Sequence, residues 1–177
     1  MIKFHLIHIP KTGGRFVKHW FSALDILDQT PLDHYTFNDA EISKNAIPFA
    51  IVRNPYHRVQ SMWNMEKQPE FTEFCQQLKD HWIGSQIEYT DGLDNIIKFE
   101  PNLITQVKKF VSLYGMDLSK EQLSQPIKLD LDEQEESHRK SPAPWTKMSL
   151  SIVNNLYREE FIKFNYSMRD PNDDSIY

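Results

Sequence analysis

Apolar residues follow two different periods along the chain, and segments of the two kinds alternate. The run Ile2–Ile9 is short, rich in β-branched and aromatic side chains, and stops at Pro10, which predicts a strand that leads into a loop. From Gly14 to Leu27, apolar residues recur every three or four positions, which predicts a helix with one buried face. The chain therefore opens as a strand, a glycine-containing loop and a helix.

The same order returns in the next part of the chain. The apolar run Ile47–Val52 predicts a buried parallel strand. A helix start follows it, because Asn54 is a favourable N-cap and Pro55 suits the first helical position, where its missing N–H would be unpaired anyway. The repeat of strand, loop and helix indicates that two loops lie at neighbouring strand ends.

Later segments continue the alternation. Asn95–Phe99 predicts a third buried strand, and the segment after Pro101 predicts an amphipathic helix that ends near Gly115. Met148–Phe161 predicts a last helix. Such alternation favours the α/β class, with a central parallel sheet covered by helices.

The composition is compatible with one domain that spans residues 1–177. The chain has 177 residues, of which 40% are hydrophobic, enough to form the core of a single domain. Two segments do not fit the alternation: residues 126–140, where an acidic run turns basic, and the proline-rich residues 141–145. We expect both to form loops, and we expect the last ten residues to be flexible.

Charge and cysteine content narrow the function classes. The formal net charge of −5 argues against broad nucleic-acid binding. The single cysteine, Cys75, excludes an internal disulfide and a metal site built from cysteines. No apolar stretch approaches the roughly 20 residues needed to span a bilayer, and the first residues lack a signal-peptide cleavage site. We therefore expect a soluble, cytoplasmic protein.

The segment Pro10–Arg15 carries the strongest chemical signal. Two of the five glycines, Gly13 and Gly14, are adjacent here, and glycine lets backbone N–H groups turn inward and leaves room for a bulky anion. The following helix adds its positive dipole end, Lys11 a full charge and Thr12 a hydroxyl donor. These features predict a phosphate site; the alternative is a tight turn with a solvated lysine.

A second candidate anion site is the segment Arg53–Ser61. Arg53 lies at the carboxyl end of the second strand, where open α/β sheets bind ligands. We expect Arg53 and the free N–H groups of the next helix to hold a second phosphate, with Ser61 adding a hydroxyl. The alternative is an N-capped helix with Arg53 and Arg58 on the surface.

Together these two segments resemble the sulfotransferases that use 3′-phosphoadenosine-5′-phosphosulfate (PAPS), most closely the carbohydrate sulfotransferases of the uronosyl 2-O type. Pro10–Gly14 matches the family's 5′-phosphosulfate loop, P-K-T-G-G-[TS], and Arg53–Ser61 matches its 3′-phosphate motif, R-[DN]-P-x-x-R-x-x-S. Later segments are also similar, namely Asp80-His81-Trp82 with Gln86, Ile96–Glu100, His138–Ser141 and Val153–Tyr166. The family usually has Thr or Ser where this chain has Arg15.

The resemblance implies a P-loop-like three-layer fold, PAPS as sulfuryl donor, PAP as product and no metal. It implies nucleotide contacts from two groups of residues, which are Lys11, Thr12, Gly13, Gly14, Arg15 and Phe16, and Arg53, Ser61, Arg139, Lys140 and Ser141. The alternative for the basic loop at 139–141 is a solvated charged segment. For Trp145 the sequence leaves open whether the ring faces adenine or belongs to the core.

Sulfuryl transfer requires stabilisation of the departing phosphate and a base for the acceptor hydroxyl. Lys11 suits the first role, because its charge would neutralise the charge that grows as the S–O bond breaks. Histidine suits the second role, and the resemblance implies His34; the alternative is a loop histidine that only packs or caps. We expect His5 and His8, in the first strand, to be structural.

The acceptor is the least determined part. The resemblance favours a saccharide hydroxyl, with His81 and Trp82 contacting the acceptor; a buried Trp beside a satisfied His is the alternative. Two rival functions stay open, an ATP-dependent kinase of the P-loop type and a non-catalytic nucleotide-binding module. In the P-loop pattern the lysine follows the last glycine, whereas Lys11 precedes both glycines.

Overall fold

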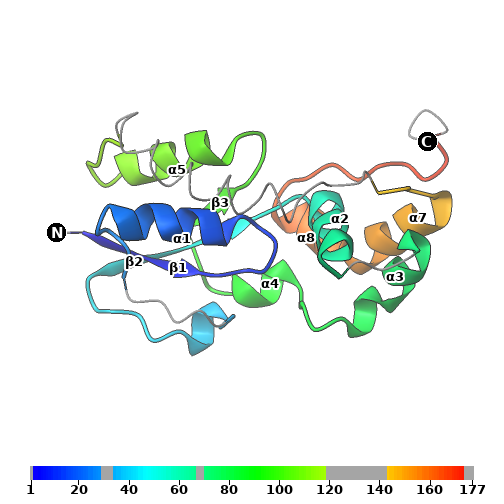
Figure 1. Cartoon of the computed structure of the whole chain (residues 1–177), viewed down its shortest axis with the longest axis horizontal. Coiled ribbons are helices and arrows are strands. Elements are labelled where there is room, and N and C mark those ends of the chain that lie inside the picture. The colour runs from blue at the N-terminus through cyan, green and yellow to red at the C-terminus, as the bar shows by residue number, and fades with distance from the viewer. Residues whose placement is uncertain (1, 29–33, 67–69, 119–142, 174–177) are drawn as a thin grey trace.

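A computed structural model of the chain describes residues 2–28, 34–66, 70–118 and 143–173. Its centre is a parallel sheet with the strand order β1–β2–β3 (Figure 1). The strands are β1 (Lys3–Ile7), β2 (Ala46–Val52) and β3 (Ile96–Lys98). Leu6 pairs with Phe49, and Ile51 pairs with Ile97. The predicted α/β class and the three predicted strands are confirmed.

Helices connect and cover the strands. They are α1 (Gly14–Ala23), α2 (Pro55–Glu66), α3 (Phe71–Gln77), α4 (Gln86–Tyr89), α5 (Leu103–Ser112), α7 (Lys147–Leu156) and α8 (Arg158–Lys163), with short 3₁₀ turns at η1 (Phe37–Asp39) and η2 (Leu78–Asp80). In the described part of the chain, no helix has the length and apolar character that crossing a membrane requires.

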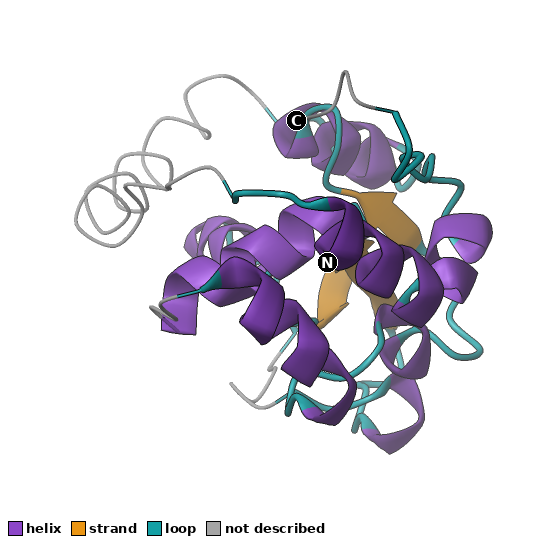
Figure 2. Ribbon diagram, turned by 90° about the vertical axis from the view of Figure 1, so that its right-hand side faces the viewer, coloured by secondary structure: helices purple, strands orange, loops and turns teal. Residues whose placement is uncertain are grey.

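The two faces of the sheet pack against different elements. Because side chains alternate along a strand, Phe4, Leu6, Phe49 and Ile51 share one face, which packs against α1 and α5. The opposite face, which includes Ile7, Ala50 and Val52, packs against α4 and residues of the C-terminal part of the chain. Figure 2 shows helices and loops around the strands.

A second apolar core lies outside the sheet, between α2, α3, α7 and α8 (right half of Figure 1). Its buried members include Tyr56, Met62, Phe71 and Phe161. Trp145 belongs to this core, because its ring centroid lies 4.7 Å from that of Phe71 and 5.3 Å from that of Tyr56. The described structure therefore gives Trp145 a packing role.

Cys75 lies in the same core and is completely buried. Burial, together with the nearby Glu70 carboxylate, raises the pKa of its thiol to about 12. The thiol is therefore protonated at neutral pH.

The helical boundaries differ from the sequence prediction in several places. The helix predicted over Gly14–Leu27 ends at Ala23, and Asp25 beyond it has φ of 53°, which is not helical. The single predicted helix Met148–Phe161 is two helices, α7 and α8, because Tyr157 between them adopts non-helical dihedral angles of −106° and 20°. Helices α3 and α4 were not predicted. The pattern of α3 is nevertheless present in the sequence, since its buried residues Phe71, Phe74 and Cys75 follow helical spacing.

Candidate functional site

The loop between β1 and α1, residues 10–14, turns sharply through two left-handed residues. Lys11 has φ of 67° and Gly13 has φ of 83°. The Thr12 hydroxyl donates a hydrogen bond to the Ile9 carbonyl at 2.8 Å, and Thr12 is fully buried. The hydroxyl that the sequence suggested as a phosphate donor therefore stabilises the turn, which leaves the backbone N–H groups and Lys11 as donors.

Both glycines of this loop are required by packing. A Cβ atom at Gly13 would lie 2.8 Å from the Phe99 ring, and one at Gly14 would lie 2.4 Å from the His8 ring. The role predicted for the two glycines was to leave space for an anion. The structure shows that the space beside each glycine is filled by an aromatic ring of the protein itself.

The turn between β2 and α2 begins at Arg53, and α2 starts as predicted. The Asn54 side chain accepts a hydrogen bond from the Tyr56 amide at 3.0 Å, as an N-cap does. The Asn54 amide itself donates to the Glu100 carboxylate at 3.1 Å. The expectation that the amides at this helix start are free for a phosphate is therefore wrong for Asn54 and Tyr56.

The two segments meet through hydrogen bonds from arginines to the first loop. Arg53 Nη1 donates to the Lys11 carbonyl at 3.2 Å, and Arg58 Nε donates to the Pro10 carbonyl at 3.2 Å. The Arg53 guanidinium also lies 4.5 Å from the centre of the Phe99 ring, the ring that packs on Gly13. The alternative with both arginines on the surface is wrong, because Arg58 is 1% exposed and Arg53 is largely buried.

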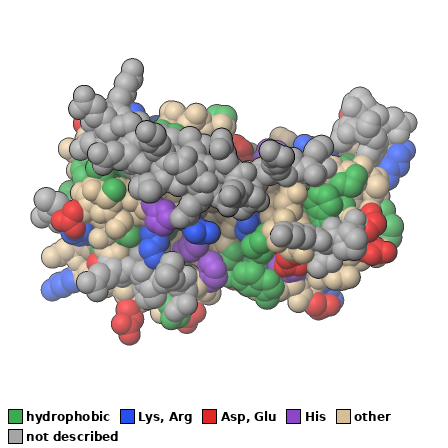
Figure 3. Space-filling view, in the orientation of Figure 1, with side chains coloured by type: hydrophobic (Ala, Val, Ile, Leu, Met, Phe, Trp, Pro, Cys, Tyr) green, Lys and Arg blue, Asp and Glu red, His purple; other side chains and the backbone are tan. Residues whose placement is uncertain are grey.

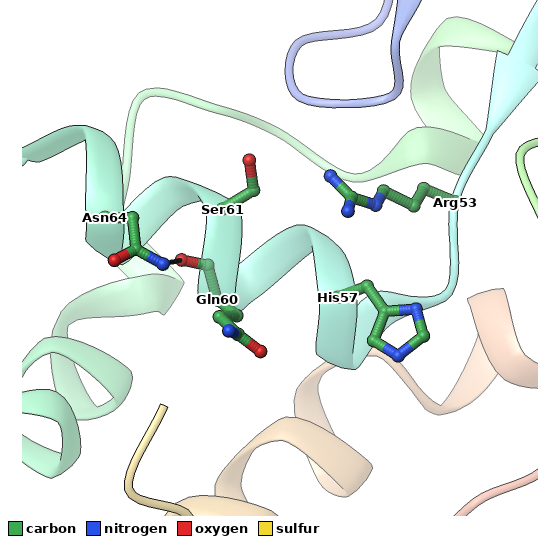
Figure 4. A pocket seen from close by; sticks show the side chains of 5 residues that line it. All are labelled: Arg53, His57, Gln60, Ser61 and Asn64. Carbon is green, nitrogen blue, oxygen red and sulfur yellow. Dashed lines mark hydrogen bonds between the residues drawn. The ribbon is translucent and has the colours of Figure 1, made fainter. Parts of the chain in front are cut away.

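Beside Arg53 lies a cavity of about 270 Å³. It is lined by Arg53, His57, Gln60, Ser61 and Asn64 (Figure 4). Figure 4 shows the Arg53 guanidinium extending along α2 toward Ser61. One ligand in the cavity could therefore contact both side chains. Burial lowers the pKa of Arg53, while Glu100 and Tyr166 act in the opposite direction. Arg53 remains charged at neutral pH.

Glu100, which follows β3 and ends the segment Ile96–Glu100, is a member of this site for which the sequence predicted no role. Its carboxylate accepts hydrogen bonds from His57 Nδ1 and the Tyr166 hydroxyl, each at 2.9 Å, in addition to the Asn54 amide. Burial acts to raise the pKa of Glu100, but the hydrogen bonds that it accepts outweigh burial and lower that pKa. Glu100 is thus a fixed negative charge next to Arg53.

His34 lies beside the first loop, against the end of β1. Its Nδ1 atom is 3.1 Å from the His8 carbonyl oxygen, and the rings of His8 and His34 are 4.8 Å apart. Burial, together with His34, Lys18 and Arg15, lowers the pKa of His8 to about 4. Figure 3 shows histidine and basic side chains gathered near the middle of one face. The His8 ring packs against Gly14 as well as against His34, and buried His5 bonds Asp28, as structural residues do.

His81 and Trp82 differ in their surroundings. His81 is held on both ring nitrogens, by the Glu66 carboxylate at 2.5 Å and the Ile83 amide at 3.1 Å. Trp82 is 62% exposed, stacks on His81 with ring centroids 5.8 Å apart, and lies 6.1 Å from the His34 ring. His81 therefore supports Trp82, and Trp82 is the residue of the pair that a ligand can reach.

The remaining predicted residues lie in three different places. Arg15 is exposed on the first turn of α1. Phe16 packs beside Trp20 with ring centroids 5.9 Å apart, at the edge of the core under α1. Arg139, Lys140 and Ser141 lie outside the described residues. Among the residues that are described, no group of three or more potential metal ligands occurs.

Comparison of the chain with models of protein families and with curated proteins gives no match. We therefore infer the function from the residues themselves, from the motif pattern in the sequence and from the geometry at the ends of β1 and β2.

Proposed function

We propose that the protein is a PAPS-dependent sulfotransferase with a P-loop-like fold. The observation that carries the proposal is the hydrogen bond from Arg53 to the Lys11 carbonyl. It joins the two segments that resemble the family's 5′-phosphosulfate and 3′-phosphate motifs. A nucleotide with phosphates on both sides of one ribose needs two anion sites at a short separation, and this contact supports such an arrangement.

In this proposal each segment binds one end of the nucleotide. The backbone N–H groups of the first loop, the N-terminus of α1 and the Lys11 ammonium bind the 5′ phosphate and its sulfuryl group. Arg53 and Ser61, which line the cavity along α2, bind the 3′ phosphate. Arg15 adds positive charge at the rim. Arg139, Lys140 and Ser141 are proposed from the resemblance alone to close over the 3′ phosphate.

The reaction is an in-line transfer. The acceptor oxygen forms a bond to sulfur while the bond from sulfur to the bridging phosphate oxygen breaks, and PAP leaves. His34 takes the proton of the acceptor hydroxyl. Lys11 neutralises the charge that grows on the departing phosphate, an interaction that is stronger in the transition state than in the ground state.

We propose a saccharide as the acceptor. Trp82 offers an exposed aromatic face, 6.1 Å from the ring of the proposed base. An aromatic face packs favourably on the apolar C–H surface of a sugar ring, whose hydroxyls then lie at its edge. Such packing would direct a ring hydroxyl toward His34.

Two measurements test the proposal. PAP without magnesium should raise the melting temperature, whereas ATP with magnesium should change it little. Incubation with sulfur-labelled PAPS and a panel of saccharide acceptors should transfer label, and Lys11→Ala should abolish most of that transfer. Stabilisation by ATP and magnesium alone would indicate a kinase. Stabilisation by PAP with no transfer to any acceptor would indicate a non-catalytic module.

A further inference from the structure

The backbone of Arg53 is held by a side chain from α4. Gln86 Oε1 accepts a hydrogen bond from the Arg53 amide at 2.8 Å, and Gln86 Nε2 donates to the Arg53 carbonyl at 2.9 Å. Gln86 is completely buried. One amide side chain thus satisfies both backbone groups of Arg53, in the way that a neighbouring strand would.

The orientation of the Gln86 amide is set by Glu160 on α8. Glu160 Oε2 accepts the second N–H of Gln86 Nε2 at 2.6 Å, and Glu160 Oε1 accepts from the Gln86 backbone amide at 2.7 Å and from the Ser85 hydroxyl at 2.9 Å. An ionised carboxylate only accepts hydrogen bonds. It therefore requires the NH₂ group of Gln86 on its own side, where the same group also reaches the Arg53 carbonyl.

Glu160 is 1% exposed, and its charge is balanced by Arg58. Arg58 Nη1 lies 3.8 Å from Glu160 Oε1, and both residues are almost completely buried. Arg58 also donates to the Pro10 and Gly84 carbonyls. The carboxylate therefore faces hydrogen-bond donors from Ser85 and Gln86 and the guanidinium of Arg58, and this arrangement fixes the polarity that it imposes on Gln86.

From these contacts we propose that Gln86, oriented by Glu160, is the positioning residue that makes Arg53 selective for a 3′-phosphorylated nucleotide. The inference rests on the proposed function. Gln86 fixes the backbone from which the Arg53 side chain projects, and the side chain then needs only its contacts with Phe99 and the Lys11 carbonyl to face the cavity. Binding of the 3′ phosphate therefore costs little ordering of Arg53.

The test compares PAP with AMP, which lacks the 3′ phosphate. The measured quantity is the ratio of the two dissociation constants, determined by calorimetry for the wild-type chain and for Gln86→Leu and Glu160→Gln. Gln86→Leu removes both bonds to the Arg53 backbone. Glu160→Gln places an NH₂ group against a donor of Gln86 in either amide orientation. Each variant should reduce the preference for PAP about tenfold, because a charge-assisted contact loses its alignment.

Ser85→Ala is the matched control. It removes one hydrogen bond to Glu160 and the N-cap of α4, whose hydroxyl accepts from the Ile87 amide. It should therefore lower the stability while leaving the Gln86 contacts with Arg53 and the preference for PAP intact. Unfolding by urea shows which variants are folded under the binding conditions. Either Gln86→Leu or Glu160→Gln suffices for the test if it is folded.

The outcomes separate the inference from the function on which it rests. A reduced preference for PAP over AMP in folded Gln86→Leu or Glu160→Gln, with Ser85→Ala unchanged, supports the inference. An unchanged preference, or equal weakening of PAP and AMP, overturns it while the proposed function stands. Failure of the wild-type chain to bind PAP overturns the proposed function, and the inference with it.

Discussion

The two segments that form the candidate site are built in different ways. The first loop, residues 10–14, is shaped by its backbone: two left-handed residues, a buried threonine that bonds its own turn and two glycines packed against aromatic rings. The second, residues 53–61, is shaped by side chains from other elements. Gln86 and Glu100 bond its backbone, and the Phe99 ring lies under its first arginine.

The hydrogen bonds between the two segments have all their donors on one side. The first loop contributes carbonyl acceptors, and the second contributes arginine donors. The arginines of the second segment therefore stabilise the first loop, in addition to their contacts with Phe99 and Gly84. We expect substitutions of the loop lysine to act on turnover, and substitutions of the second segment to act on nucleotide affinity.

The largest effect should come from Lys11→Ala. Removal of a positively charged donor from the breaking bond should lower kcat by about 10²–10³-fold, with a smaller change in the KM for PAPS. The substitution keeps a Cβ atom at a residue whose φ is 67°, so it introduces no new backbone strain. Label transfer measures the effect, and Lys18→Ala on α1 is the control. Equal losses in both variants would contradict the role of Lys11.

A large effect on stability should come from Gly13→Ala. Alanine at φ of 83° costs about 1–2 kcal/mol, and contact with the Phe99 ring adds about 1 kcal/mol or more. Gly115→Ala is the matched control, because Gly115 has φ of 75° but no atom near the added Cβ. Urea unfolding gives both values. The same cost for both glycines would mean that the loop yields to Phe99 without strain.

Arg53→Lys should weaken PAP binding about tenfold while leaving kcat at saturating PAPS nearly unchanged. Lysine keeps the charge but loses the planar group that lies over Phe99 and reaches the Lys11 carbonyl. Calorimetry with PAP and turnover at saturating PAPS separate the two quantities. A loss confined to kcat would reverse the division of roles between the two segments.

The smallest effect is a pH dependence of stability at His8. The pKa of His8 is about 4 in the folded chain, against an ordinary value of 6.5 that applies to the unfolded chain. The folded chain therefore binds this proton more weakly than the unfolded chain does. Its contribution to stability is therefore fully present above pH 6.5 and declines as the pH falls toward 4. His8→Asn should flatten the profile of urea unfolding in this range. His19→Asn, at an exposed position of α1, is the control substitution.

Much of the fold could be predicted because the strands are apolar runs and the main helices are amphipathic. The start of α2 was predictable from Asn54 and Pro55, whose local chemistry determines a helix N-terminus. The break at Tyr157 was not predictable, because the apolar pattern continues across it. The break accompanies the tertiary contacts of Glu160 with Ser85 and Gln86, residues far away in the sequence.

The site could be predicted only where one segment carries the signal. The lysine, the glycines and Arg53 are marked by their motifs. Glu100, Gln86 and Glu160 act through contacts that join segments more than 30 residues apart. A single sequence contains no period or spacing that reveals such contacts. The same limit explains why the glycines were attributed to an anion, since the rings that they accommodate belong to His8 and Phe99, the residues that follow β1 and β3.

The buried thiol of Cys75 should not interfere with the labelling of cysteines introduced elsewhere in the chain. With a pKa of about 12, it presents almost no thiolate to an alkylating reagent at neutral pH. Cysteines introduced at Leu113 and Ile162, two exposed positions on separate elements, can therefore carry a pair of fluorophores. Energy transfer between those dyes would report whether nucleotide binding shortens the distance between the end of α5 and α8.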